Sequence, residues 1–549
     1  MQEDLSSRQG WLWGLAIVLF ASAIGFWRLR FGLDLELAFT DERLVWGRYL
    51  ADFVPLRPHS FARPPGGGAF LYPTLVGYFA GFLTWITHKL RWIPDPSIDV
   101  FPAFYVARMM TTGFAVATVV LVGVLGRMID SVRAGVISAA LMAVVPVCVI
   151  QAHYVSTDPV QCFFMTLALL LAVVLAREGG VGVAILAGAS VGLAFAAKYT
   201  GLLAGVPVAW AVLERARVAE GSGLRTFVVL GAAAFSACLG AAVLGCPLCF
   251  LRGGDVLSVL GFYSGLTSYG NLLFWRVELV PALGWYGRPF LYQLVATLPF
   301  CLGIAIYLAS LAGVGRALAV RDAGHRLLLV TVAVYLVFAS LSVSLLPRYL
   351  IPILPPLVLL AGGALAALRA PLLRRVLACA VWLYTAAIAV TQVGRLSYDQ
   401  QMAASEWLRT DATRDWTWIA GPEPQPTVAV PTTMWSYAGL VRPFYLAGVK
   451  PTLVAPGEWL RDRPDYVVVP DLVADWIRTR PEAEPLRGDL AALESGDAGY
   501  AKVAAWSSRY FSESLYTAID PIFSADYPQG EIGFTIFSRR GPPSERPQD

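Results

Sequence analysis

Two adjacent acids, Asp41 and Glu42, follow the first long apolar stretch of the chain, directly after Thr40. Carboxylates beside lipid are costly and are usually kept for chemistry, charge pairing or ion binding. One carboxylate could accept a proton from an acceptor hydroxyl while the other orients it or helps to hold a divalent cation against a phosphate. Oxygen ligands suit Mg²⁺ or Mn²⁺, the one cofactor that the sequence suggests. The alternative is structural: Thr40 caps a helix whose first turn carries both acids.

Three more charged residues lie within or between apolar stretches. They could face the same side of the membrane as Asp41 and Glu42. Asp158 lies in a polar turn and could work in catalysis or cap the helix that begins near Pro159. Lys198 stands between two apolar stretches and could bind a phosphate or extend to lipid headgroups. Arg348 lies at the edge of another stretch, and a guanidinium binds phosphate through two parallel hydrogen bonds. Lys198 and Arg348 together could neutralise a phosphate leaving group at membrane depth.

Further candidates for substrate contacts lie beside these groups or in the first loop. His59 and Arg63 share the loop of Asp41, although a lone exposed histidine is more often incidental. Arg108 could contact substrate, anchor the first loop or mark a helix end. The aromatic candidates are Tyr72, Tyr199 and Tyr349.

The elements that must position these groups are membrane helices. Of the 549 residues, 57% are hydrophobic and 15% are charged, and the mean hydropathy of +0.61 excludes an ordinary soluble domain. A bilayer core of about 30 Å needs about 20 apolar residues in a helix. About eleven stretches meet or approach this length: 11–29, 101–126, 134–150, 159–176, 181–197, 200–213, 225–250, 290–313, 326–346, 350–369 and 372–393. The net charge of +4 gathers in no long basic run, so nucleic acid is not an expected partner.

Arginines distinguish the two faces of the predicted membrane protein. Successive loops of a polytopic protein lie on opposite faces of the membrane. Counted in this way, one face receives the following arginines: Arg127, Arg133, Arg177, Arg215, Arg217, Arg316, Arg321, Arg369, Arg374 and Arg375. By the positive-inside rule this face is cytoplasmic, as is the N-terminus. Asp41, Asp158, Lys198 and Arg348 then share the outer face. We therefore expect an integral protein of a bacterial inner or plasma membrane.

Residues 71–92 are apolar enough to span the bilayer, but a crossing here would invert every later loop. We therefore expect a juxtamembrane helix in the outer interface, with its aromatic residues, His88 and Lys89 at headgroup level. The proline- and glycine-rich stretch 63–68 before it predicts a flexible entry loop.

Composition divides the chain into two expected domains. Residues 1–394 form the membrane domain, with an external loop and juxtamembrane helices in 30–100. Residues 395–549 are charged and punctuated by prolines, and they predict a small α/β domain outside the membrane with a disordered tail. Its expected strands lie at 427–431, 466–470 and 533–537, and its helices at 397–409 and 472–478. All seven cysteines adjoin apolar runs, so we expect buried, unpaired thiols, including the C-x-x-C pair Cys246 and Cys249.

These motifs, in this order, resemble the GT-C-fold membrane glycosyltransferases that use a polyprenyl-phosphate sugar, especially the protein O-mannosyltransferase and lipid A aminoarabinose transferase branch. The resemblance covers about the first 370 residues. It rests on the acid pair, Arg108, and the stretches 71–75, 156–159, 192–201 and 348–356. It implies that Asp41 is the catalytic carboxylate, that Asp158 supports the site, and that Lys198 and Arg348 meet the lipid phosphate. The chain departs from the family at Pro73-Thr74, where two prolines are common, and its C-terminal region does not match the lumenal domain of the protein-mannosylating members.

The expected reaction moves a hexose-type sugar such as mannose from a polyprenyl-phosphate donor to a lipid, glycan or protein acceptor on the external face, with Asp41 as base. Membrane lipids are the other expected partners. A transporter or lipid flippase is the alternative class, but its charges should lie near mid-membrane in symmetry-related helices. A third class is an assembly protein in which the acids only cap helices.

Overall fold

The computed structural model describes the chain in segments that belong to two compact units. The described residues are 7–31, 33, 50, 73–219, 222–251, 254, 289–320, 322–340, 347–394, 396, 399–414, 428–431, 451–454, 460, 462–470, 474, 477–478, 484–506 and 534–539. The larger unit draws on Met1–Leu29, Asp41–Val277 and Gly287–Val393. The smaller unit draws on Arg30–Thr40, Glu278–Tyr286 and Gly394–Asp549.

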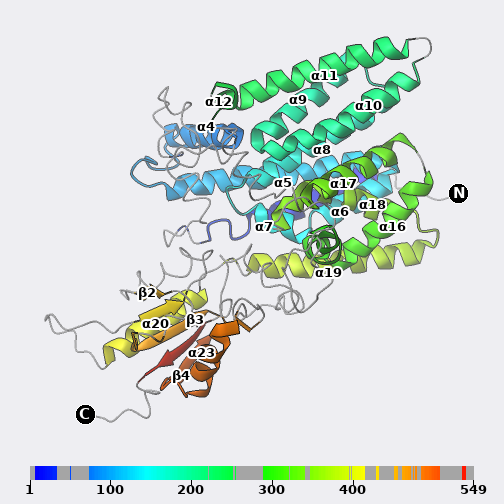
Figure 1. Ribbon diagram of the computed structural model, residues 1–549. Coiled ribbons are helices and arrows are strands. Elements are labelled where there is room, and N and C mark those ends of the chain that lie inside the picture. Colours follow the sequence, from blue (N-terminus) through cyan, green and yellow to red (C-terminus); the bar gives the residue numbers. More distant parts are fainter. Residues whose placement is uncertain are drawn as a thin grey trace. The chain divides into compact units, whose positions relative to one another are not determined.

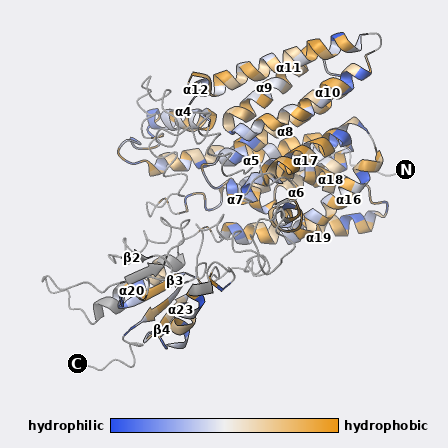
Figure 2. Ribbon diagram, in the orientation of Figure 1, coloured by the Kyte–Doolittle hydropathy of each residue, from blue (hydrophilic) through white to orange (hydrophobic). Residues whose placement is uncertain are grey.

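The larger unit is a bundle of long apolar helices (Figure 1). Within the described residues, seven helices are long and apolar enough to cross a bilayer, or eight if one sharply bent pair is a single span. The candidate spans are α1 (Ser7–Phe26), α5 (Phe101–Ile129), α8 (Thr157–Arg177), α11 (Gly223–Gly245), α17 (Ala323–Ser340), α18 (Leu354–Ala366) with the turn before it, and α19 (Pro371–Gly394). Helix α16 (Ile304–Val320) belongs to the bent pair, and α9 (Val181–Ala197) is a shorter apolar helix. Hydrophobic residues dominate these helices (Figure 2). The predicted polytopic α-helical class is confirmed, while the expected number of about eleven spans stays a prediction.

Two of the expected stretches are broken rather than continuous. Residues 134–150 form α6 (Val132–Met142) and the short α7 (Pro146–Gln151), because Pro146 has no N–H to continue the first helix. Residues 290–313 contain a bend of 118° between Gln293–Leu302 and Ile304–Val320. The bend falls at Gly303, whose φ of 75° is a backbone conformation that glycine adopts without steric cost.

The helix expected near residues 71–92 is α4 (Leu75–Lys89), and it is short. Its 15 residues extend for about 22 Å, less than the hydrocarbon thickness of a bilayer. One face, including Val76, Ala80 and Thr84, is buried, whereas Phe82 is exposed. A helix in this stretch is confirmed, while its place in the outer interface of the membrane stays a prediction.

Close packing of α9 against α11 fixes the position of the polypeptide around Lys198. A Cβ on Gly188 would lie 1.9 Å from the carbonyl oxygen of Ala234, and a Cβ on Gly192 would lie 2.2 Å from that of Cys238. Small residues let membrane helices approach to backbone contact in this way. The 3₁₀ helix η3 (Tyr199–Ala204) then connects α9 to α10 (Gly205–Arg217). Helices α9, α10 and α11 lie side by side (Figure 1).

The cysteine prediction is wrong at one pair. Cys246 and Cys249 form a disulfide at the corner between α11 and α12 (Pro247–Leu251). The turn at Pro247 brings their Cα atoms to 5.6 Å, within the usual range for a disulfide. The other five cysteines are free, as expected, and Cys162 and Cys301 are buried. The expected burial is wrong for Cys379, which is exposed on α19, and Cys148 and Cys238 are only partly buried.

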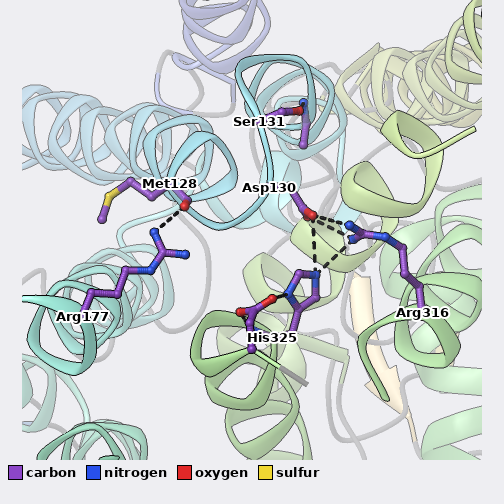
Figure 3. Close-up of polar contacts among 8 residues, drawn as sticks. Met128, Asp130, Ser131, Arg177, Arg316 and His325 are labelled. Carbon is purple, nitrogen blue, oxygen red and sulfur yellow. Dashed lines mark hydrogen bonds and ion pairs between the residues drawn. The ribbon is translucent and has the colours of Figure 1, made fainter. Parts of the chain in front are cut away.

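A polar cluster ties several helices together at the end of the bundle where α8 finishes (Figure 3). Arg316 on α16 donates two hydrogen bonds to the carboxylate of Asp130, which follows α5. The Nε2 of His325 on α17 lies 3.1 Å from Arg316 Nη1 and 3.6 Å from Asp130 Oδ1. Gly363 on α18 leaves room for this carboxylate, since a Cβ there would lie 2.5 Å from Asp130 Oδ2. Arg177, in the last turn of α8, donates to the Met128 carbonyl beside the cluster.

The smaller unit contains a five-stranded mixed sheet, as an α/β domain should. The strands are β1 (Val428–Pro431), β2 (Pro451–Val454), β3 (Tyr466–Pro470), β4 (Ala501–Trp506) and β5 (Phe534–Ser538), in the order β2-β1-β3-β5-β4. β1 runs parallel to β2 and β3, whereas β5 runs antiparallel to β3 and β4. Helix α23 (Glu484–Ser495) packs Leu490 and Leu493 into a core with Val467 and Phe537. The helix expected at 397–409 is α20 (Asp399–Arg414), and most of the one expected at 472–478 lies outside the described residues.

Candidate active site

Asp158 sits in the first turn of α8, but it is not the helix cap. Ser156 is the N-cap, and its hydroxyl accepts a hydrogen bond from the backbone N–H of Asp158 at 3.2 Å. The same hydroxyl donates to Asp158 Oδ2 at 3.0 Å. The capping role that the sequence left open for Asp158 therefore belongs to Ser156, and the second carboxylate oxygen is available for another partner.

That partner is Lys198, which lies forty residues away in sequence. Its Nζ is 2.7 Å from Asp158 Oδ1, and the two side chains are 16% and 5% exposed. Lys198 occupies the break between α9 and η3, where its extended backbone directs the chain into a new turn. Gly201 permits this corner, because a Cβ there would lie 2.2 Å from the backbone of Ala194. The ion pair thus depends on the packing that brings η3 to the start of α8.

Arg348 and Tyr349 complete the cluster from η6 (Pro347–Ile353). The Lys198 Nζ lies 5.1 Å from the centre of the Tyr349 ring, and the Arg348 guanidinium carbon lies 5.9 Å from the same centre. Both distances fit cation–π contacts. The two cations are consequently no farther apart than the sum of these distances, although they come from distant parts of the sequence.

Two of the four residues of this cluster are cations. Asp158 pairs with Lys198 and holds its ammonium in place, while the Arg348 guanidinium contacts the Tyr349 ring. An ammonium with three donors and a guanidinium with a planar fork are the groups that bind phosphate oxygens in proteins. The structure therefore brings together three predicted charged residues, Asp158, Lys198 and Arg348, together with Tyr349. We call these four residues the Asp158–Arg348 cluster.

Sequence reasoning missed a buried amide next to this cluster. Gln161 is one turn after Asp158 on α8, and its Nε2 lies 2.7 Å from Thr200 Oγ1 and 3.2 Å from the hydroxyl of Tyr335. The signal was present: a glutamine in an otherwise apolar helix needs hydrogen-bond partners, and its spacing places it on the face of Asp158.

Two other predicted residues lie among protein groups. Arg108 is fully buried and donates from Nη1 to the carbonyl oxygen of Leu29, just after α1, at 3.0 Å. This contact ties α5 to the end of the first apolar stretch, while an anchoring of the first loop by Arg108 stays a prediction. The ring of Tyr199 packs edge-on against Phe195 at 5.8 Å. Substrate contacts of Arg108 and Tyr199 stay predictions.

The first-loop candidates lie outside the described residues. These are Asp41, Glu42, His59, Arg63 and Tyr72, so the catalytic and metal-binding roles assigned to the acid pair stay predictions. Among the residues that the structure does describe, no three or more His, Cys, Asp or Glu side chains are grouped to hold a metal ion.

An apolar cavity lies beside the first turn of α8. Its volume is about 40 Å³, and Ile24, Thr112, Pro159, Cys162 and Ile351 are among the residues that line it. A cavity of this size holds a few water molecules at most. It is therefore no candidate for a sugar pocket.

Comparisons with known proteins agree with the fold. The sequence profile of the dolichyl-phosphate-mannose-protein mannosyltransferase family matches residues 75–236, a stretch that includes Asp158 and Lys198. No curated protein sequence matches the chain. Among solved structures, ArnT from Cupriavidus metallidurans bound to undecaprenyl phosphate has a TM-score of 0.51 at 14% identity, over 86% of this chain and 95% of that one. The oligosaccharyltransferase AglB from Archaeoglobus fulgidus has a TM-score of 0.47 at 14% identity, over 91% and 74%.

The likeness to ArnT extends over nearly the whole of both chains and shows a shared fold. The predicted resemblance to GT-C-fold, polyprenyl-phosphate-sugar-dependent glycosyltransferases is thereby confirmed. The profile match and the fold together indicate a membrane enzyme that uses a lipid-phosphate-sugar.

Proposed function

We propose that this protein transfers a sugar, of the mannosyl type, from a polyprenyl-phosphate donor to an acceptor on the outer face of a bacterial inner membrane. The observation that carries the proposal is the Asp158–Arg348 cluster. It places an ammonium and a guanidinium against one tyrosine ring at the ends of membrane helices. A lipid-linked donor would have its phosphate at this depth, because its polyprenyl chain stays in the bilayer.

In the proposed reaction, a nucleophilic oxygen or nitrogen of the acceptor attacks the anomeric carbon of the sugar. Asp41 takes the proton from that atom. The bond between the anomeric carbon and the phosphate oxygen breaks, and its electron pair goes to the phosphate. Lys198 and Arg348 stabilise the charge that develops there, and polyprenyl phosphate is released. Such a single displacement inverts the anomeric carbon.

The membrane orientation is part of the same proposal. Asp158 begins α8 and Arg177 ends it, so about 30 Å of helix separates the candidate site from the arginine-rich end. The positive-inside rule makes the arginine-rich end cytoplasmic. The candidate site then faces a compartment without nucleotide sugars, where a lipid-linked donor is the available sugar source.

Two measurements on the detergent-purified chain test the proposal. The first is binding of undecaprenyl phosphate, followed by native mass spectrometry, which does not depend on the identity of the sugar. The second is conversion of undecaprenyl-phosphate mannose to undecaprenyl phosphate in the presence of an envelope extract as acceptor pool. Asp41→Asn should abolish conversion while keeping the dissociation constant of undecaprenyl phosphate, measured in EDTA, within about twofold, because a base that holds no cation does not bind the phosphate.

Controls separate this reading from the alternatives. Thr166→Val removes a buried hydroxyl that bonds only its own helix, and it should leave conversion unchanged. Loss of conversion with EDTA, restored by Mg²⁺ or Mn²⁺, would support a cation at Asp41 and Glu42. The proposal is abandoned if undecaprenyl phosphate does not bind saturably or if Asp41→Asn turns over like the wild type. A transporter would instead move the donor across proteoliposomes without consuming it.

A further inference from the structure

The segment that carries Lys198 has a second tie to α8 besides the Asp158 ion pair. Gln161 follows Asp158 by three residues, and Thr200 follows Lys198 by two, so the Gln161–Thr200 hydrogen bond runs next to the ion pair. Both ties measure 2.7 Å between heavy atoms. The start of η3 is thus attached to α8 once through an ammonium and once through a hydroxyl.

The same amide reaches a third element. Gln161 Nε2 has two hydrogens, and the second partner in range is the hydroxyl of Tyr335 on α17. Gln161 and Tyr335 are both buried, at 1% and 3% exposure. Because the amide is planar, two partners on one nitrogen fix its orientation, and Gln161 therefore sets the position of η3 relative to α8 and α17.

Position matters here because η3 has little rigidity of its own. A 3₁₀ helix has poorer hydrogen-bond geometry than an α-helix and rarely extends beyond a few residues. The ion pair cannot hold η3 alone throughout a catalytic cycle, since an ammonium that turns to a phosphate loosens its bond to Asp158. The Gln161–Thr200 bond does not involve the ammonium and persists through that change.

We propose that Gln161, through Thr200 and Tyr335, is a positioning residue for Lys198 and thereby sets the affinity for the donor phosphate. This inference rests on the proposed function, because it assigns Lys198 to that phosphate. Gln161 itself touches no substrate. It holds the backbone of η3 in place relative to α8 while the Lys198 ammonium moves from Asp158 to the donor phosphate.

The test measures undecaprenyl phosphate binding and donor KM in Gln161→Met, Thr200→Val and Tyr335→Phe. Each variant should weaken donor binding about three- to tenfold, the range that buried side-chain hydrogen bonds in membrane proteins support. The acceptor KM should not change. Thr200→Ser keeps the hydroxyl and should restore wild-type binding. Thr166→Val and Thr331→Val are matched controls, because each removes a buried hydroxyl from α8 or α17 that bonds its own helix.

A double-mutant cycle distinguishes positioning from a general loss of stability. In a Lys198→Met background, Gln161→Met should no longer weaken binding, because its effect acts through the missing ammonium. An equal loss in both backgrounds, or wild-type binding by Gln161→Met, would overturn the inference. If Gln161→Met does not fold, the Thr200→Val and Thr200→Ser pair gives the same comparison. Failure of the wild type to bind undecaprenyl phosphate would count against the proposed function. Weakened binding in Lys198→Met together with wild-type binding in Gln161→Met and Thr200→Val would count only against this inference.

Discussion

Replacing Lys198 by methionine tests both the architecture and the chemistry of the candidate site. Methionine keeps the length of the apolar stem and removes the ammonium. Asp158, whose side chain is 5% exposed, then loses its ion-pair partner at 2.7 Å and, among the described residues, keeps its hydrogen bonds with Ser156. A buried carboxylate without its counter-charge is costly, so two effects should appear together: lower stability and weaker phosphate binding.

Their magnitudes can be separated. Breaking a buried ion pair by removing one partner costs about 3 kcal/mol of stability, because an uncompensated charge remains. The double variant Lys198→Met with Asp158→Asn removes both charges, so it should regain most of that loss. It should not regain binding, because no ammonium is restored. A hydrogen bond to a charged group contributes about 1.5 to 3 kcal/mol, which corresponds to roughly 10- to 150-fold weaker binding of undecaprenyl phosphate in both variants.

The assay compares thermal unfolding in detergent with native mass spectrometry of bound undecaprenyl phosphate. Lys502→Met, on β4 of the smaller unit, makes the same chemical change at an exposed site and should alter neither measurement. Wild-type binding by a folded Lys198→Met protein would refute the assignment of Lys198 to the phosphate. Failure of the double variant to recover stability would refute the claim that the loss comes from an unpaired Asp158.

Three further predictions concern other parts of the larger unit. Gly192→Ala should lower the unfolding temperature by several degrees, because its Cβ would lie 2.2 Å from the carbonyl oxygen of Cys238. Gly182→Ala on the same helix is the control: its Cβ would meet nothing within 4 Å, so it should be neutral in the same thermal scan. Arg316→Met removes both guanidinium hydrogen bonds to Asp130, which keeps its 3.6 Å contact with His325. This variant should lower thermal stability without changing the dissociation constant of undecaprenyl phosphate, because the lost ion pair lies at the far end of α8. Tyr349→Phe keeps the ring and should bind undecaprenyl phosphate like the wild type, whereas Tyr349→Leu should bind it a few-fold more weakly, and equal affinities of the two variants would contradict the cation–π contacts.

The positions of the charged candidates were predictable because few polar residues interrupt the apolar stretches. Asp158, Lys198 and Arg348 each stood out for this reason, and the alternation of loops placed them at one face. The short α4 was predictable as well, since a full crossing there conflicted with the arginine pattern. The order of the loops and the hydropathy of the sequence are sufficient for these predictions, and no knowledge of helix packing is needed.

The contacts between distant elements were not predictable. The spacing of Arg316 and His325 along the chain says nothing about Asp130, and only the packing of α5, α16 and α17 brings them together. The amide of Gln161 was overlooked because a single polar residue does not disturb the hydropathy of a helix. The strands β2 and β4 were not predicted because β2 begins at a proline and β4 contains three alanines, and both residue types are depleted in strands.

The Cys246–Cys249 disulfide has a consequence for anyone who prepares the protein. Gly245, beside it, accepts a hydrogen bond from Thr74 at 3.0 Å, immediately before α4. Reducing agents added during purification, or synthesis in a reducing lysate, can open the covalent loop at the point where the start of α4 meets α11. Samples for activity or crystallisation should therefore be handled without thiol reductants, and their oxidation state should be verified by mass before two preparations are compared.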